Sequence, residues 1–93
     1  MTVRLSELNC KEVICISSGQ RLGFVSDVKI CLPKGEVVAL LVPGPGKMMG
    51  FLARCEDYVI PFDCIKQIGP DIILVDIVPE ECLCARPRFL PGL

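Results

Sequence analysis

The chain has 93 residues, a formal net charge of −1 and an apolar fraction of 52%. This length is enough for one domain with a modest core, and so apolar a composition excludes disorder over most of the chain. The 10 basic and 11 acidic residues are spread along the sequence. Because nucleic-acid binders usually concentrate their basic residues, we expect no nucleic-acid partner.

We expect neither a signal peptide nor a membrane span. The first residues lack a basic segment followed by an apolar stretch, which a secretory signal would need. The longest apolar runs are shorter than the ~18–20 residues that cross a bilayer. Both features favour a cytoplasmic location.

The first predicted elements are one helical turn at Arg4–Leu8 and a strand at Glu12–Ile16. Alternation along this strand places Val13 and Cys15 on one face. The residues Ser17–Gln20 have the composition of a turn.

A long, apolar β-hairpin is the strongest local pattern. Arg21–Leu32 predicts one long strand that bends at Gly23, and Val37–Val42 predicts the returning strand. Gly35 in the connecting turn is expected to take a left-handed conformation. The returning strand is apolar on both faces, which indicates a central strand or one covered on each side. Alternation predicts a core face on the long strand made of Leu22, Phe24, Val28, Ile30 and Leu32.

The second half of the chain predicts further short strands after a glycine-rich loop at Pro43–Gly50. The predicted elements are strands at Asp57–Ile60, Ile65–Ile68 and Ile72–Val78, with one tight turn at Phe62–Ile65. About six strands and almost no helix indicate an all-β fold, a small and mostly antiparallel barrel. We expect this barrel to span residues 1–78 and an extended C-terminal tail to span residues 79–93.

The residues predict no catalysis and no cofactor. The chain has no histidine, so neither a Ser/His/Asp nor a Cys/His catalytic pair can be built. Gly46 and Lys47 are followed by Met48, which breaks the Walker pattern for phosphate binding. We therefore predict that the protein is not an enzyme.

Seven cysteines are many for this length, but their odd number argues against a complete disulfide framework. Cys15 and Cys31 lie in strand-like segments and are expected to act as small apolar residues. The Cys-x4-Cys and Cys-x-Cys spacings differ from the usual zinc knuckle, so no metal site is predicted. The alternative function is a cysteine-based metal-binding or redox protein, in which these thiols would converge: Cys10, Cys64, Cys82 and Cys84.

Exposed apolar residues next to the glycine-rich loop and in the tail are the candidate interaction residues, because such patches usually mark partners. We expect a protein partner, with a homodimer as one form of the association. The candidate residues are Met48, Met49, Phe51, Leu52, Phe89 and Leu90.

A series of short segments also stands in an order typical of one family. The segments are Arg4–Leu8, Lys11–Ile14, Gly19, Arg21–Gly23, Asp27, Gly35–Leu40, Tyr58–Pro61, Ile65, Ile68–Gly69 and Asp71–Val75. Together they resemble the PRC-barrel domain, and most closely its small, single-domain, sporulation-associated subgroup of the YlmC/YmxH type. The resemblance covers the chain from Arg4 to Asp76.

The resemblance implies a β-barrel of about six strands and a Gram-positive spore-former as the source. In the photosynthetic reaction-centre H subunit and in a ribosome maturation factor, the same barrel serves binding and assembly rather than catalysis. The resemblance therefore implies a non-enzymatic protein-interaction or assembly module associated with sporulation. It implies no catalytic, cofactor-binding or metal-binding residues.

Overall fold

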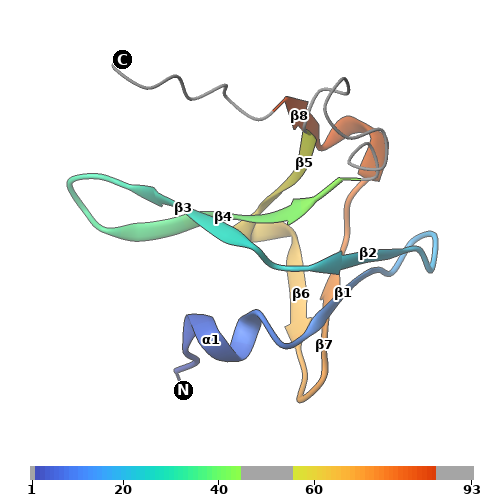
Figure 1. The fold of residues 1–93 in the computed structure, drawn as a ribbon, viewed down its shortest axis with the longest axis horizontal. Helices are drawn as coiled ribbons and strands as arrows, with labels where there is room; N and C mark the ends of the chain where they lie inside the picture. Colours follow the sequence, from blue (N-terminus) through green and yellow to red (C-terminus); the bar gives the residue numbers. More distant parts are fainter. Residues whose placement is uncertain (1, 45–55, 86–93) are drawn as a thin grey trace.

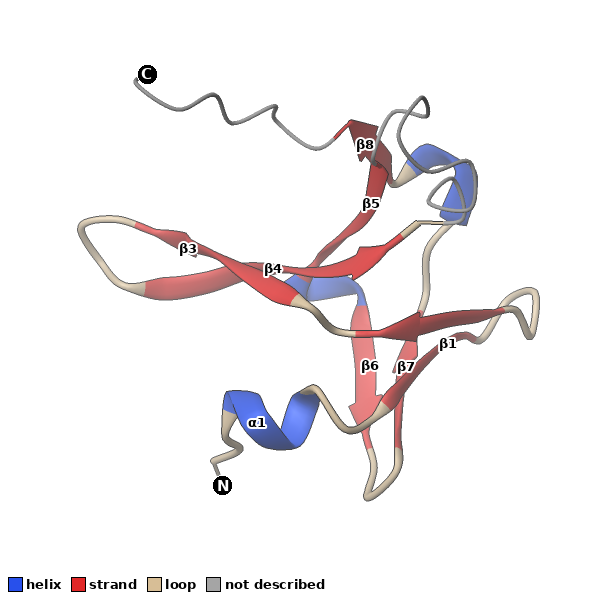
Figure 2. Ribbon diagram, in the orientation of Figure 1, coloured by secondary structure: helices blue, strands red, loops and turns tan. Residues whose placement is uncertain are grey.

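The computed structural model describes residues 2–44 and 56–85, which form eight strands, one α-helical turn and two 3-10 turns (Figures 1 and 2). In chain order the elements are α1 (Leu5–Leu8), β1 (Glu12–Cys15), β2 (Arg21–Phe24), β3 (Asp27–Cys31), β4 (Glu36–Pro43), β5 (Glu56–Pro61), η2 (Phe62–Cys64), β6 (Ile65–Ile68), β7 (Ile72–Val75), η3 (Pro79–Glu81) and β8 (Leu83–Ala85).

The strands form two four-stranded sheets. One sheet has the order β2-β1-β7-β6 and the other the order β3-β4-β5-β8. Five of the six pairings between described strands are antiparallel, and the exception is β1 with β7, where Glu12 lies opposite Ile72 and Cys15 opposite Val75. The all-β class and the mostly antiparallel arrangement predicted from the sequence are confirmed.

Both sheets enclose one apolar core. The chain passes between the sheets three times, from β2 to β3, from β5 through η2 to β6, and from β7 through η3 to β8 (Figure 1). Each sheet therefore contributes side chains to the same interior, as in a small barrel. The fully buried side chains are Val13, Cys15, Leu40, Val42, Ile60, Ile73 and Val75.

The prediction of one continuous strand over Arg21–Leu32 is wrong. The chain leaves the first sheet after Phe24 and enters the second sheet at Asp27. At this crossing the backbone N–H of Ser26 donates to the carbonyl of Leu41 at 2.8 Å. Val25, which is not among the residues of the predicted core face, is buried. Changing sheets interrupts the ladder for two residues, and this interruption breaks the alternation that the prediction extended through it.

Three of the five predicted core residues on that strand consequently lie outside the core. Phe24 is 51% exposed, Ile30 is 53% exposed and Leu32 is 79% exposed. Leu22 is buried and Val28 is half-buried, as predicted. Alternation identifies which residues share a face of a strand, but it does not indicate where the strand passes beyond its neighbours.

The two glycines singled out in the hairpin behave as expected. Gly23 has a φ of +121° and lies beside a register shift in the β1–β2 pairing, which confirms the predicted bend. A Cβ atom at Gly23 would lie 3.4 Å from Val42 Cγ1, so β2 packs closely against β4 here. Gly35 has a φ of +76° in the hairpin turn, which confirms its left-handed conformation.

The residues that follow β7 return to the second sheet. β7 ends at Val75 rather than Val78, and just beyond it the N–H of Asp76 donates to the Cys64 carbonyl at 2.9 Å. In the predicted tail, Pro79–Glu81 forms η3 and Leu83–Ala85 forms β8, which pairs with β5. The split of the long strand and the addition of β8 account for eight described strands instead of about six. Residues 86–93 of the predicted tail lie outside the described part of the chain.

The predicted helical turn is confirmed as α1, four residues long, with Leu8 buried against the core. No helix within residues 2–44 or 56–85 is long and apolar enough to cross a lipid bilayer.

Leu40 and Leu32 test the difference between the core and the projecting end of the hairpin. Leu40→Ala removes a fully buried side chain and should lower the free energy of unfolding by about 2–5 kcal/mol. Leu32→Ala, the matched control, should change that free energy by less than about 0.5 kcal/mol. Urea denaturation of the two variants measures both values, and equal losses would contradict the assignment of Leu32 to the surface.

Candidate interaction surface

The hairpin of β3 and β4 projects beyond the rest of the barrel (Figure 1). β4 pairs with β5 only from Pro43 to Ala39, where Ala39 lies opposite Pro61. The three residues Glu36–Val38 continue β4 past this point, and within the described ranges the strand pairs there with β3 alone. This outer part of the hairpin therefore has one free backbone edge.

The apolar side of the hairpin is an extension of the core-facing side. Val28 and Leu40 lie opposite each other on β3 and β4, and the next pair on that side is Ile30 with Val37. Leu40 is fully buried, whereas Ile30 is 53% exposed. A register shift between these two pairs makes Val38 an additional residue on β4, and Val38 is also exposed. The side of the sheet that fills the core thus emerges at the surface.

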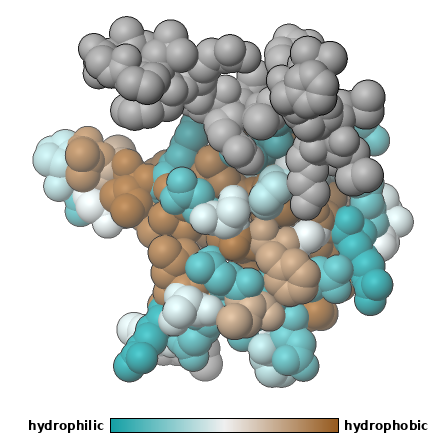
Figure 3. All heavy atoms as spheres, in the orientation of Figure 1, coloured by the Kyte–Doolittle hydropathy of each residue, from teal (hydrophilic) through white to brown (hydrophobic). Residues whose placement is uncertain are grey.

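A 3-10 turn places an aromatic side chain beside this edge. Pro61 ends β5, where a residue without an N–H cannot extend the ladder, and the chain turns into η2. Phe62, the first residue of η2, keeps 43% of its surface exposed. We call Ile30, Val37, Val38 and Phe62 the hairpin patch. Figure 3 shows apolar residues gathered over the projecting hairpin and continuing toward the barrel.

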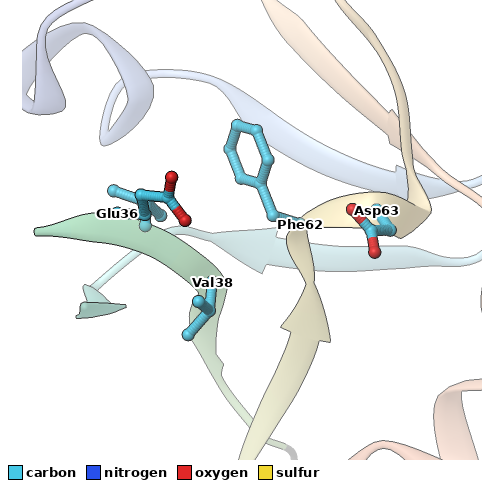
Figure 4. Close-up of a pocket in the computed structure, with 5 residues that line it drawn as sticks. Glu36, Val38, Phe62 and Asp63 are labelled. Atoms are coloured by element: carbon cyan, nitrogen blue, oxygen red, sulfur yellow. The ribbon is translucent and has the colours of Figure 1, made fainter. Parts of the chain in front are cut away.

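An open hollow of about 500 Å³ lies between β4 and η2. Glu36 and Val38 project from β4, and Phe62 and Asp63 project from η2 (Figure 4). The hollow is lined by Glu36, Val37, Val38, Phe62 and Asp63. Its walls are therefore apolar, with one carboxylate contributed by each of the two elements.

The two carboxylates of the hollow have no partner among residues 2–44 and 56–85. Neither Glu36 nor Asp63 forms an ion pair or a side-chain hydrogen bond there. The ion pair found in this part of the chain joins Arg21 Nε to Glu12 Oε1 at 3.5 Å on the first sheet. Among the described residues, the hollow therefore combines apolar side chains with two carboxylates that have no ion-pair partner.

The interaction residues predicted from the sequence lie outside the described part of the chain: Met48, Met49, Phe51, Leu52, Phe89 and Leu90. They stay a prediction. The hairpin patch was missed because Ile30 was assigned to the core and because Phe62 was assigned only to a turn. The available signal was the length of Arg21–Leu32, which exceeds what one sheet of a small barrel can cover.

Cys15 is enclosed in the core rather than exposed for chemistry. Its Sγ donates to the Ile77 carbonyl at 3.2 Å and lies 3.3 Å from Ser17 Oγ. Burial by itself raises the pKa of the Cys15 thiol, but hydrogen bonds with Ser17 and Ser18 and with backbone groups outweigh it and lower the pKa to about 7. A reactive thiol must also be accessible, and Cys15 is fully buried.

The remaining described cysteines do not form a metal centre. Burial, together with the nearby thiols of Cys64 and Cys84 and the Glu81 carboxylate, raises the pKa of the Cys82 thiol. A raised pKa disfavours the thiolate form that binds metals. Within residues 2–44 and 56–85, no three cysteine or acidic side chains are grouped so that they could hold a metal ion.

Comparison with known proteins agrees with this architecture. Residues 1–81 match the PRC-barrel domain. The chain belongs to the PRC-barrel family. It is 38% identical over 73 residues to the "Probable sporulation protein YlmC" of Bacillus subtilis, a match that covers 78% of this chain and 90% of the relative. It is also 40% identical over 81 residues to the "Uncharacterized protein YmxH" of the same organism, covering 85% of this chain and 93% of the relative.

A third relative comes from another genus. The "Uncharacterized protein CA_C1697" of Clostridium acetobutylicum is 33% identical over 72 residues, which cover 77% of this chain and 82% of the relative. These matches confirm the predicted family and its YlmC/YmxH type.

Alkylation rates should separate the enclosed thiol from the exposed ones. In the folded protein we expect iodoacetamide to modify the exposed Cys10, Cys31 and Cys84 quickly and Cys15 slowly, since attack needs access as well as a thiolate. Peptide mapping by mass spectrometry gives the rate at each site, and a urea-unfolded sample is the control in which the differences should disappear. If Cys15 reacts as fast as Cys31 in the folded protein, the redox alternative gains and the enclosed-thiol description fails.

Proposed function

We propose that this chain is a non-enzymatic protein-interaction or assembly module that acts in the cytoplasm during sporulation. The observation that carries the proposal is the Ile30–Val37 pair, which lies on the core-facing side of the second sheet but outside the core. Contiguous exposed apolar residues usually mark a site where another protein binds. The hairpin patch gives such a surface a fixed position on two paired strands.

The comparisons support the biological setting of this proposal. A PRC-barrel relative that spans most of the chain carries the name of a probable sporulation protein. The name supports a role in sporulation for this chain, and the hairpin patch supports protein binding as the form of that role. The cysteine-based alternative has weaker support, because it depends on the number of cysteines and its most enclosed thiol, Cys15, lies in the core.

Affinity capture with a patch variant tests the proposal. Ile30→Asp with Val38→Asp places charge on the hairpin patch without touching buried side chains, so the barrel should stay folded while the captured partners are lost. The matched control is Ile16→Asp, because Ile16 is similarly exposed but follows β1 of the other sheet. Quantitative mass spectrometry compares proteins bound to the three baits from extracts of growing and of sporulating cells.

The expected result is a set of proteins enriched from sporulating cells on the wild-type and Ile16→Asp baits and absent from the patch variant. Equal recovery on all three folded baits would show that the hairpin patch is not the binding surface. Recovery of no protein above an unrelated bait would contradict the interaction function itself.

Two sequence-based expectations enter the same experiment as separate arms. A Met48→Asp, Phe51→Asp double variant tests whether the glycine-rich segment contributes to partner binding, and unchanged recovery would remove it. Sedimentation velocity of the wild-type chain tests the predicted homodimer, and a monomer at micromolar concentration would exclude it.

A further inference from the structure

We propose that the hollow between β4 and η2 binds an extended, basic segment of a partner protein, which pairs with Glu36–Val38 as an added strand. This inference rests on the proposed function, since it names the chemistry of the partner at the hairpin patch. Strand addition to a free sheet edge is a common mode of peptide recognition, in which backbone hydrogen bonds supply affinity and side-chain pockets supply specificity.

The free edge is the first element of the argument. β4 extends three residues beyond its pairing with β5, because Pro61 ends the β4–β5 ladder and the chain then turns into η2. An unpaired edge is a template for another strand unless charges or proline protect it. β3, the outer strand of the same sheet, has Asp27 and Lys29 exposed along its length, whereas two of the three residues Glu36–Val38 are valines.

The hollow supplies the side-chain pocket. Its volume of about 500 Å³ lies within the ~300–1,000 Å³ that is usual for ligand sites. Val38 lies on β4 and Phe62 on η2 (Figure 4), and both line the hollow, so an apolar side chain of an added strand that enters the hollow would contact them. Alternate residues of a strand point to opposite sides. Every second residue of the partner segment would therefore point toward the hollow.

The charge of the hollow selects a basic partner. Glu36 and Asp63 line it without an ion pair among the described residues. A Lys or Arg two residues away from the apolar residue, on the same side of the added strand, would compensate one or both carboxylates. An acidic segment, and equally the phosphates of a nucleic acid, would be repelled.

The same charge argues against a second copy of this chain at the hollow. A two-fold pairing of Glu36–Val38 with itself would bring two hollows to one interface, with both copies of Glu36 and Asp63. Four carboxylates would then lie within the range where like charges repel strongly. A heterologous basic strand avoids this conflict.

Fluorescence anisotropy with designed peptides tests the inference. The probe is a short fluorescent peptide in which valine and lysine alternate at every second residue, with threonine between them, so that both lie on the same side of the strand. It is added to the wild-type chain at low ionic strength. We expect it to bind, and a peptide with glutamate in place of lysine not to bind. The double variant Glu36→Gln, Asp63→Asn should weaken binding roughly 3- to 20-fold, as expected for two partly exposed ion pairs. The matched control Asp76→Asn, Glu80→Gln makes the same change in net charge at exposed sites and should leave the affinity unchanged.

N-methylation of the probe tests strand addition itself. Successive amides of an added strand point alternately toward and away from β4. Methyl groups on one alternate set of amides should therefore weaken binding about tenfold or more, while methyl groups on the other set should have little effect. Equal effects of the two sets would contradict pairing with the edge.

Four further results would overturn the inference. The first two are no binding of the valine–lysine probe and equal binding of the glutamate peptide. The third is a dimer in sedimentation velocity that Val38→Asp dissociates, and the fourth is tighter probe binding after Arg86→Glu with Arg88→Glu. The third result would identify a second copy as the occupant, and the fourth would identify the C-terminal residues of the chain itself. A separate outcome is that the double variant Ile30→Asp, Val38→Asp loses the captured partners while the wild-type chain binds no probe peptide. In that case the proposed interaction function stands, and the inference of strand addition fails.

Discussion

Strand β4 is the element on which both the fold and the proposed surface depend. Leu40 and Val42, in its inner part, are fully buried between the two sheets, while Glu36–Val38 extends beyond the end of β5. Because side-chain alternation continues along a strand, the apolar side that fills the core must reach the surface where the neighbouring strand ends. The hairpin patch follows directly from this difference in length.

This arrangement gives the surface a fixed geometry. The patch lies on paired strands, and the inner part of β4 is held by the core, so little ordering is needed when a partner binds. Association is less costly when the binding surface is already ordered. The rest of the barrel then serves as the support that holds a short free edge, an apolar hollow and two carboxylates in place.

The sequence predicted the class of fold and most strands, because hydrophobic alternation, prolines and glycines are local signals. Val13 and Cys15 were correctly placed on a common face of their strand, which proves to be the buried one, and Gly23 and Gly35 at the bend and the turn. The pairing of β8 with β5 and the sheet change at Val25 depend on contacts between distant segments, which no local pattern contains. For the same reason Ile30 was assigned to the core, and the hollow between β4 and η2 could not be predicted.

Amide hydrogen exchange along β4 tests the central claim most directly, because it reports strand by strand which backbone groups are protected. In the free protein we expect slow exchange at Leu40 and Val42 and fast exchange at those amides of Glu36–Val38 that point away from β3. Exchange in Glu36–Val38 should slow when the valine–lysine probe is added, with Leu40 unchanged. If Glu36–Val38 is already as protected as Leu40 in the free protein, the outer part of β4 is covered and the account of an open interaction surface is contradicted.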